Sequence, residues 1–156
     1  MQYPSSDIPQ ANRLDLVVEV VIARSQPDID THEIIEIIRS KTQKEYDPRQ
    51  ANYYADAAVS FGLLQKTETG YLRTRLGDLL RSKSAVGEGD DVFRQALMNT
   101  PLIADLIRDL DHDYKGNVSL ENVSNWLHEH TDLAPATVVR RSSNILRCIE
   151  FLNKES

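Results

Sequence analysis

The sequence predicts a mainly helical protein with one small β-hairpin, arranged as three helices and the hairpin followed by a second helical unit. Apolar residues recur at helical spacing along most of the 156 residues, and capping side chains precede several of these stretches. Only residues 63–75 show two short extended runs around a glycine turn. Residues 1–10 carry Pro4, Pro9 and paired serines, so we expect a flexible leader there.

The first two helices are predicted from apolar stripes with clear ends. The first stripe ends before Pro27, and its members are Leu14, Val17, Val18, Val21 and Ile22. The second helix covers about residues 31–41 and begins with a capping box, because Asp30 and Glu33 have the spacing at which each side chain binds the other's backbone N–H. The apolar face of this second helix consists of Ile34, Ile35, Ile37 and Ile38.

A third helix is predicted over about residues 48–61. Asp47 can cap it, Pro48 suits its first turn, and Gln50 completes a possible second capping box. Alanines on its inner side permit close packing against another helix, and that inner face is made of Ala51, Tyr54, Ala55, Ala58 and Phe61. The hairpin then pairs residues 63–66 with residues 71–75 across a Thr-Glu-Thr-Gly turn.

The second half of the chain repeats the helical pattern without a hairpin. Thr100 and Pro101 begin a helix whose apolar residues are Leu102, Ile103, Leu106, Ile107 and Leu110. A Gly-Asn turn and a Ser119 cap precede a helix with Leu120, Val123, Trp126 and Leu127 inward. The last helix, about residues 135–152, is expected to bury Val138, Ile145, Ile149 and Leu152. Either this unit lacks a hairpin or the chain belongs to a longer protein.

The order of helix, helix, helix and hairpin is that of a winged helix-turn-helix. The stretch "YYADAAVSFGLLQKTETGYLRTRLGDLL" resembles the recognition helix and wing of such modules. It is more particularly similar to a winged-helix family attached to, or encoded beside, restriction endonucleases and other bacterial defence proteins. That family's helix often carries "RqadYYxnAaxyLGL", and a later segment resembles "sxxTxxRRxsTvxxWlxWl". The second phrase is matched at Thr137, Arg140, Arg141 and Ser143, whereas Cys148 and Phe151 replace its tryptophans.

The resemblance implies a winged-helix domain at residues 11–83 and a helical helix-turn-helix-like domain at residues 84–156. It implies duplex DNA binding, as the recognition or accessory part of a restriction or defence protein or as a small transcriptional regulator. In such modules a recognition helix contacts base edges, while the wing and the helix N-terminus contact phosphates. The residues expected to contact DNA are Lys41, Lys44, Arg49, Gln50, Asn52, Tyr53, Lys66, Arg73, Arg75, Thr137, Arg140, Arg141 and Asn144.

The charge distribution decides whether DNA binding is physically reasonable for an acidic chain. The formal net charge is -6, which argues against general attraction to nucleic acid. The acidity is uneven, however, with -3 in residues 1–30 and -7 in residues 84–135, against +2 in residues 31–83 and +2 in residues 136–156. A locally basic face can therefore still attract phosphate, with strong dependence on salt.

Two alternatives remain open at the level of sequence. The same winged-helix surface can dock a protein partner or a second copy of the chain in place of DNA. The basic residues can also be ordinary solvated side chains, with Arg140 or Arg141 paired to the acidic segment at residues 84–135.

Catalytic and metal-binding patterns are weak throughout the chain. Residues 111–122 match a calcium-binding EF-hand loop in part, but Lys115 and Asn122 replace two ligands, which favours a capped turn. The histidines near acidic residues, His112, His128 and His130, do not form a zinc-protease motif. We therefore expect no enzyme activity and no cofactor in this chain, with any nuclease centre on another domain or partner.

Cys148 is the only cysteine, so the chain can form no internal disulfide, and we expect the thiol to be a small core residue. No secretory signal or apolar span is visible in the sequence, so a cytoplasmic protein without a membrane partner is expected.

Overall fold

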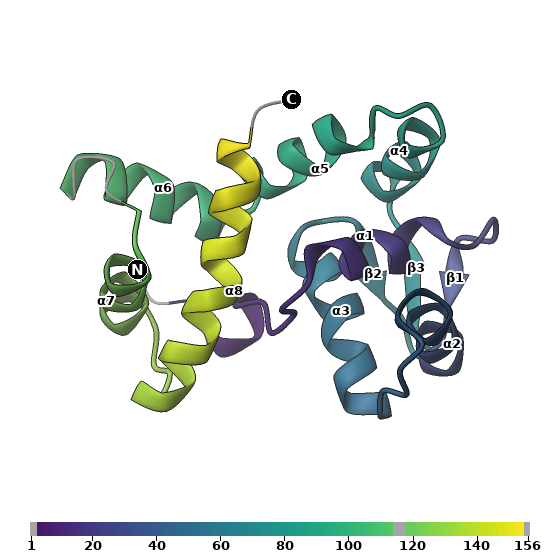
Figure 1. Ribbon diagram of the computed structural model, residues 1–156, viewed down its shortest axis with the longest axis horizontal. Helices are drawn as coiled ribbons and strands as arrows, with labels where there is room; N and C mark the ends of the chain where they lie inside the picture. Colours follow the sequence, from purple (N-terminus) through teal and green to yellow (C-terminus); the bar gives the residue numbers. More distant parts are fainter. Residues whose placement is uncertain (1–2, 114–117, 155–156) are drawn as a thin grey trace.

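The computed structural model describes residues 3–113 and 118–154 and is mainly helical with one small antiparallel sheet (Figure 1). After a short 3-10 turn, η1 at Ser5–Asp7, the first half contains α1, α2, α3 and α4 at Leu14–Ile22, Thr31–Thr42, Pro48–Ser60 and Arg75–Ser84. The second half contains α5, α6, α7 and α8 at Gly89–Met98, Pro101–Asp113, Leu120–His130 and Pro135–Asn153. The coarse fold class predicted from the sequence is therefore confirmed.

The sheet has the strand order β1-β3-β2, with strands at Asp28–Ile29, Leu64–Lys66 and Tyr71–Arg73. The predicted hairpin is β2 and β3, which pair antiparallel. Its second strand ends at Arg73 because Thr74 caps α4, accepting a hydrogen bond from the backbone N–H of Gly77. Strand β1 was not predicted, since two residues are too few to show an alternating pattern. Gly70 is required beside β1, because a Cβ there would lie 2.3 Å from the carbonyl oxygen of Ile29.

Local capping follows the sequence closely. The predicted capping box at the start of α2 is present, with Asp30 and Glu33 each accepting from the other's backbone N–H. Asp47 caps α3 by accepting from the N–H of Gln50 at 2.8 Å. Ser119 caps α7 in the same way. These contacts join residues three apart, so sequence spacing alone specifies them.

The buried stripe of α1 is displaced from its predicted position. Fully buried residues on α1 are Leu16, Val17, Val20 and Val21, while the predicted Leu14, Val18 and Ile22 are only partly buried. The reason is that α1 packs against α2, α3 and α4 together, which buries a wider face than one partner would. Leu120 on α7 was also wrongly predicted to face inward, since it is 42% exposed.

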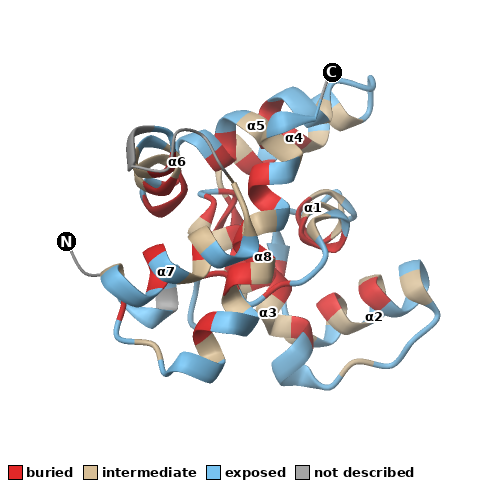
Figure 2. Ribbon diagram, turned by 60° about the vertical axis from the view of Figure 1, so that its left-hand side comes forward, coloured by how far each residue is buried: buried red, intermediate tan, exposed pale blue. Residues whose placement is uncertain are grey.

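One continuous apolar core crosses the predicted domain boundary at residue 84. Phe93 of α5 connects the two halves, packing edge-on against Phe61 at the end of α3 and against Phe151 of α8. In Figure 2 the buried residues of α3 and α8 lie toward the middle of the molecule. The predicted boundary thus coincides with the end of α4 but does not separate two cores.

Part of the segment predicted to be a flexible leader is packed against the second half of the chain. Tyr3 is 6% exposed, and its backbone N–H donates to the carbonyl of His130 at 2.8 Å. Its hydroxyl donates to the carboxylate of Asp105, and its ring lies 5.9 Å from that of Trp126. Ile8 is buried as well. We call residues 3–12 the strap, because they run from the second half of the molecule to the start of α1.

The histidine-rich end of α7 has a structural role. The ring of His130 stacks on Trp126 with 4.1 Å between centroids, and the indole N–H of Trp126 donates to Asp109 at 2.8 Å. That hydrogen bond lowers the pKa of the Asp109 carboxyl. The EF-hand-like segment and its predicted Gly-Asn turn fall partly on residues 114–117, which lie outside the described residues.

Cys148 is fully buried in α8, and burial raises the pKa of its thiol to about 12. Only the thiolate reacts rapidly with a disulfide reagent, so at about pH 8 we expect Cys148 to resist labelling by Ellman's reagent in the native protein. One thiol should react when the chain is unfolded in guanidinium chloride. Rapid labelling of the native protein would contradict the packing of α8 described above.

Candidate nucleic-acid interface

Helix α3 presents a polar side to solvent because its apolar side is held tightly. Ala51, Ala55 and Ala58 are buried where α3 packs against α1 and α2. Alanines allow this close approach. Because the alanine side faces inward, Arg49 and Gln50 in the first turn of the helix face solvent. The carboxylate of Asp47 already caps this end of the helix, so an anionic ligand here would meet the outward side chains.

The middle of α3 is oriented by hydrogen bonds to three other segments. Asn52 accepts from the hydroxyl of Thr31 on α2 at 3.0 Å. Tyr54 donates to the side chain of Asn12 in the strap at 2.7 Å. Asp56 accepts from Tyr71 of β3 at 2.6 Å. These bonds hold the helix in one orientation relative to the sheet and the strap.

A groove of about 630 Å³ lies between the first half of α3 and the middle of α8. It brings together residues from the strap, the α2–α3 turn, α3 and α8, namely Gln10, Asn12, Lys44, Glu45, Tyr46, Gln50, Tyr53, Tyr54, Arg140, Ser143, Asn144 and Arg147. We call this the α3–α8 groove. Five of the residues predicted to contact DNA line it, two of them from the second half of the chain.

Positive charge without a carboxylate partner gathers around this groove. Within residues 3–113 and 118–154, eight Lys and Arg side chains form no ion pair with Asp or Glu: Lys41, Lys44, Arg49, Arg75, Arg81, Arg140, Arg141 and Arg147. Lys44, Arg140 and Arg147 line the groove, and Arg49 adjoins its wall at Gln50. Glu45 is the only acidic residue in the lining, and Arg39 pairs with it at 2.5 Å.

Arg141 and Asn144 hold the strap, although the sequence predicted DNA contacts for both. Asn144 is 7% exposed and its amide donates to the carbonyl of Pro9 at 3.2 Å. The guanidinium of Arg141 donates to the carbonyl of Ile8 at 3.0 Å. Burial lowers the pKa of Arg141, and the nearby charge of Arg140 also lowers it. Among the described side chains, neither Arg140 nor Arg141 forms an ion pair with the acidic segment at residues 84–135.

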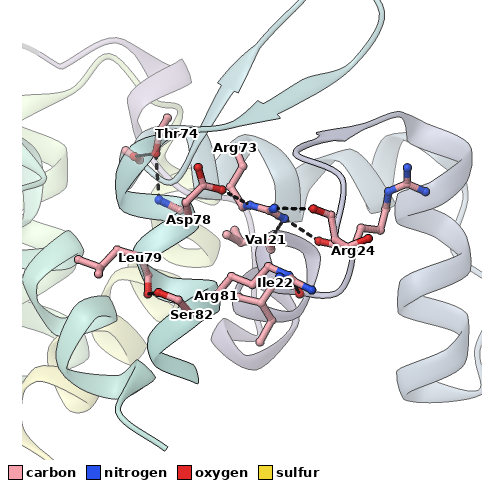
Figure 3. A network of polar contacts seen from close by, with 12 residues as sticks. Val21, Ile22, Arg24, Arg73, Thr74, Asp78, Leu79, Arg81 and Ser82 are labelled. Carbon is pink, nitrogen blue, oxygen red and sulfur yellow. Dashed lines mark hydrogen bonds and ion pairs between the residues drawn. The ribbon is translucent and has the colours of Figure 1, made fainter. Parts of the chain in front are cut away.

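Arg73 was predicted to be a wing contact, but its side chain points into the protein and not toward solvent (Figure 3). Only 5% of the side chain is exposed. Its guanidinium donates to the backbone carbonyls of Val21, in the last turn of α1, and of Arg24 and Ser25, which lie just after the helix. Its Nε donates to Asp78 at 2.7 Å. Its side-chain donors are therefore directed at the protein itself.

The other residues predicted to contact DNA are spread over different parts of the surface. Lys66 lies on β2, with its Nζ 3.9 Å from a carboxylate oxygen of Asp56. Arg75 is exposed, but it is the first residue of α4 and not part of a strand. Lys41 is exposed near the end of α2. On α8, Thr137 accepts a long hydrogen bond of 3.4 Å from Arg140.

Arg147 and Tyr46 were not among the predicted contacts, although both line the groove. Arg147 lies seven residues after Arg140, so helical periodicity places both on one face of α8. The spacing could therefore have predicted Arg147 from the sequence. No sequence pattern predicts Tyr46, because it lies in a turn and its ring reaches the groove by packing 5.9 Å from the ring of Tyr54.

Comparisons with protein-family models, curated proteins and solved structures found no match to this chain. None of the helices in the described ranges is long and apolar enough to cross a membrane. In the same part of the chain, no group of three or more His, Cys, Asp or Glu side chains is placed to hold a metal ion.

Proposed function

We propose that this protein binds double-stranded DNA through the outer side of α3 and the α3–α8 groove. The observation that carries the proposal is the gathering of unpaired cations around one groove in a chain of net charge -6. Phosphate contacts from Lys and Arg supply most of the affinity of DNA-binding proteins. Acidic residues elsewhere are compatible with this, because charge screening limits their effect at distances beyond about 10 Å.

The arrangement of elements supports a winged helix-turn-helix as the scaffold. The described order of α1, β1, α2, α3, β2 and β3, with β1 pairing to the hairpin, gives three helices on a small sheet. In this interpretation α3 is the recognition helix. We propose that the chain acts as a recognition or accessory module of a restriction or defence protein, or as a small transcriptional regulator.

Fluorescence polarisation on a labelled DNA duplex at about 50 mM and about 200 mM salt tests the proposal directly. The wild-type protein should bind at low salt and lose affinity at the higher salt, because bound phosphates release counterions. Replacing the exposed Arg49 by glutamate should weaken binding without changing the thermal unfolding midpoint. Absence of binding at low salt would remove the DNA proposal.

The alternative is a protein-docking surface on the same face, where Tyr46, Tyr53 and Tyr54 line the groove. Large exposed apolar side chains among the described residues lie on six different segments, as Leu72, Leu79, Val86, Met98, Leu120 and Val139. Protein interfaces are usually centred on contiguous apolar or aromatic side chains. Sedimentation of the protein alone and with DNA would separate self-association from DNA binding.

A further inference from the structure

The two walls of the α3–α8 groove come from opposite ends of the chain. One wall is the α2–α3 turn and the first half of α3, with Lys44, Gln50 and Tyr53. The other is α8, where Arg140 and Arg147 are two turns apart on one face. Both arginines are exposed and neither has a carboxylate partner among the described residues. The groove therefore presents cations from both sides to whatever lies between them.

Two of the acidic groups near the groove, Glu45 and Asp15, are already paired with arginines outside the groove lining. Glu45 is paired with Arg39. Beyond Arg147 lies a shallower hollow lined by Asp15 and Glu150, and Asp15 is paired with Arg13 at 2.6 Å. That pairing lowers the pKa of the Asp15 carboxyl, so the group stays ionised and neutralised at neutral pH. Arg140 and Arg147 thus keep most of their charge available for an external anion.

The hairpin is poorly equipped to be the second DNA contact. Arg73 is buried in hydrogen bonds to the protein, and Lys66 lies between Asp56 and the ring of Tyr71. The turn between the strands contains Glu68 and no Lys or Arg. A wing normally places positive charge on the phosphate backbone beside the recognition helix. In this protein, α8 has that charge and the hairpin has little of it.

We infer that the α3–α8 groove binds the sugar–phosphate backbone of one strand of the duplex, and that α8 replaces the hairpin as the second DNA contact. Arg140 and Arg147 contact phosphates from one side, and Lys44 contacts them from the other. This inference rests on the proposed function, since it specifies how the same DNA is held. The strap fixes the position of the α8 wall. Arg141 and Asn144 lie on the same helix as Arg140 and Arg147, and they donate hydrogen bonds to backbone carbonyls of the strap.

Three double charge reversals with the same total change in charge test the inference. The groove variant is R140E/R147E. The hairpin variant is K66E/R75E, in which Lys66 lies on β2 and Arg75 begins α4 directly after the hairpin. The remote variant is K83E/R108E, on exposed residues that line neither the groove nor the hollow beside Arg147. Affinity for one labelled duplex is measured over a series of salt concentrations. Circular dichroism establishes that each variant is folded, and R140Q/R147Q replaces the groove reversal if that variant is not.

We expect the groove variant to lose about tenfold or more in affinity at low salt, and its log–log salt slope to fall by about two, one for each lost phosphate contact. The hairpin and remote variants should lose about twofold through the general change in charge. An equal or larger loss in the hairpin variant would overturn the inference, as would wild-type affinity in the groove variant. Absence of duplex binding by the wild type would instead remove the proposed function itself.

Discussion

Replacing Arg73 by methionine is expected to destabilise the protein by about 3 kcal/mol, because three backbone carbonyls lose charged donors at once. Each buried acceptor left without a partner costs about 1–3 kcal/mol. The full sum is not expected, since Ser25 is exposed and Arg24 is only partly buried, so water can reach their carbonyls after the change. The ion pair with Asp78 adds little, because that carboxylate is 58% exposed. Urea unfolding followed by circular dichroism measures the difference.

Arg75 provides the matched control for this experiment. It lies two residues further along the chain, is exposed and forms no ion pair within the described residues, so Arg75→Met should change stability by less than about 0.5 kcal/mol. If the proposed function holds, the folded Arg73→Met protein should bind DNA with nearly wild-type affinity. A stable Arg73→Met variant that has lost DNA binding would show that Arg73 is a DNA contact, contrary to the structure.

Replacing Tyr3 by alanine is expected to cost about 3 kcal/mol, a large effect for a residue so near the start of the chain. The ring is buried against Trp126, and removing a buried aromatic side chain leaves a cavity that typically costs about 3–5 kcal/mol. The hydrogen bond to Asp105 is lost with it. We place the value at the lower end because Tyr3 lies outside the helices and strands, so the strap around it can shift to fill part of the space.

Two further variants separate the contributions of Tyr3. Tyr3→Phe removes only the hydroxyl and should cost about 1 kcal/mol, while Asp7→Ala changes an exposed strap residue and should cost less than about 0.5 kcal/mol. Limited proteolysis adds a second readout, since loss of the Tyr3 anchor should expose the strap to cleavage. If Tyr3→Ala is as stable as Asp7→Ala, the strap is not held as described.

The successful sequence predictions depend on contacts between near neighbours. The capping box of α2, the Asp47 and Ser119 caps and the hairpin each join residues only a few positions apart. The inner face of α3 was also predicted correctly, with Ala51, Tyr54, Ala55, Ala58 and Phe61 all buried. Helical periodicity and the small size of alanine were sufficient for that result.

The failures concern polar residues whose partners are distant in sequence. Arg73 has the composition of a wing contact, but its acceptors lie about fifty residues earlier, at the end of α1. Asn144 resembles an exposed helix residue, but its acceptor is Pro9. The strap was interpreted as flexible from its prolines and serines, and no local signal showed that Tyr3 and Ile8 are buried. A charged or amide side chain looks the same in sequence whether its partner is water or a remote carbonyl.

The sequence by itself determined α1, α2, α3, α6, α7 and α8, because apolar periodicity decides them, but α4 and α5 were not predicted as separate helices. It also determined the caps of α2, α3 and α7, the hairpin and the buried side of α3, which depend on local hydrogen bonds and periodicity. Only the tertiary structure decided which cations remain available to a ligand. It directed Arg73 and Arg141 into the protein and placed Arg140 and Arg147 opposite Lys44 across one groove. The physical reason is that a groove is made by surfaces from α3 and α8, which are far apart in the chain and meet only when the core packs.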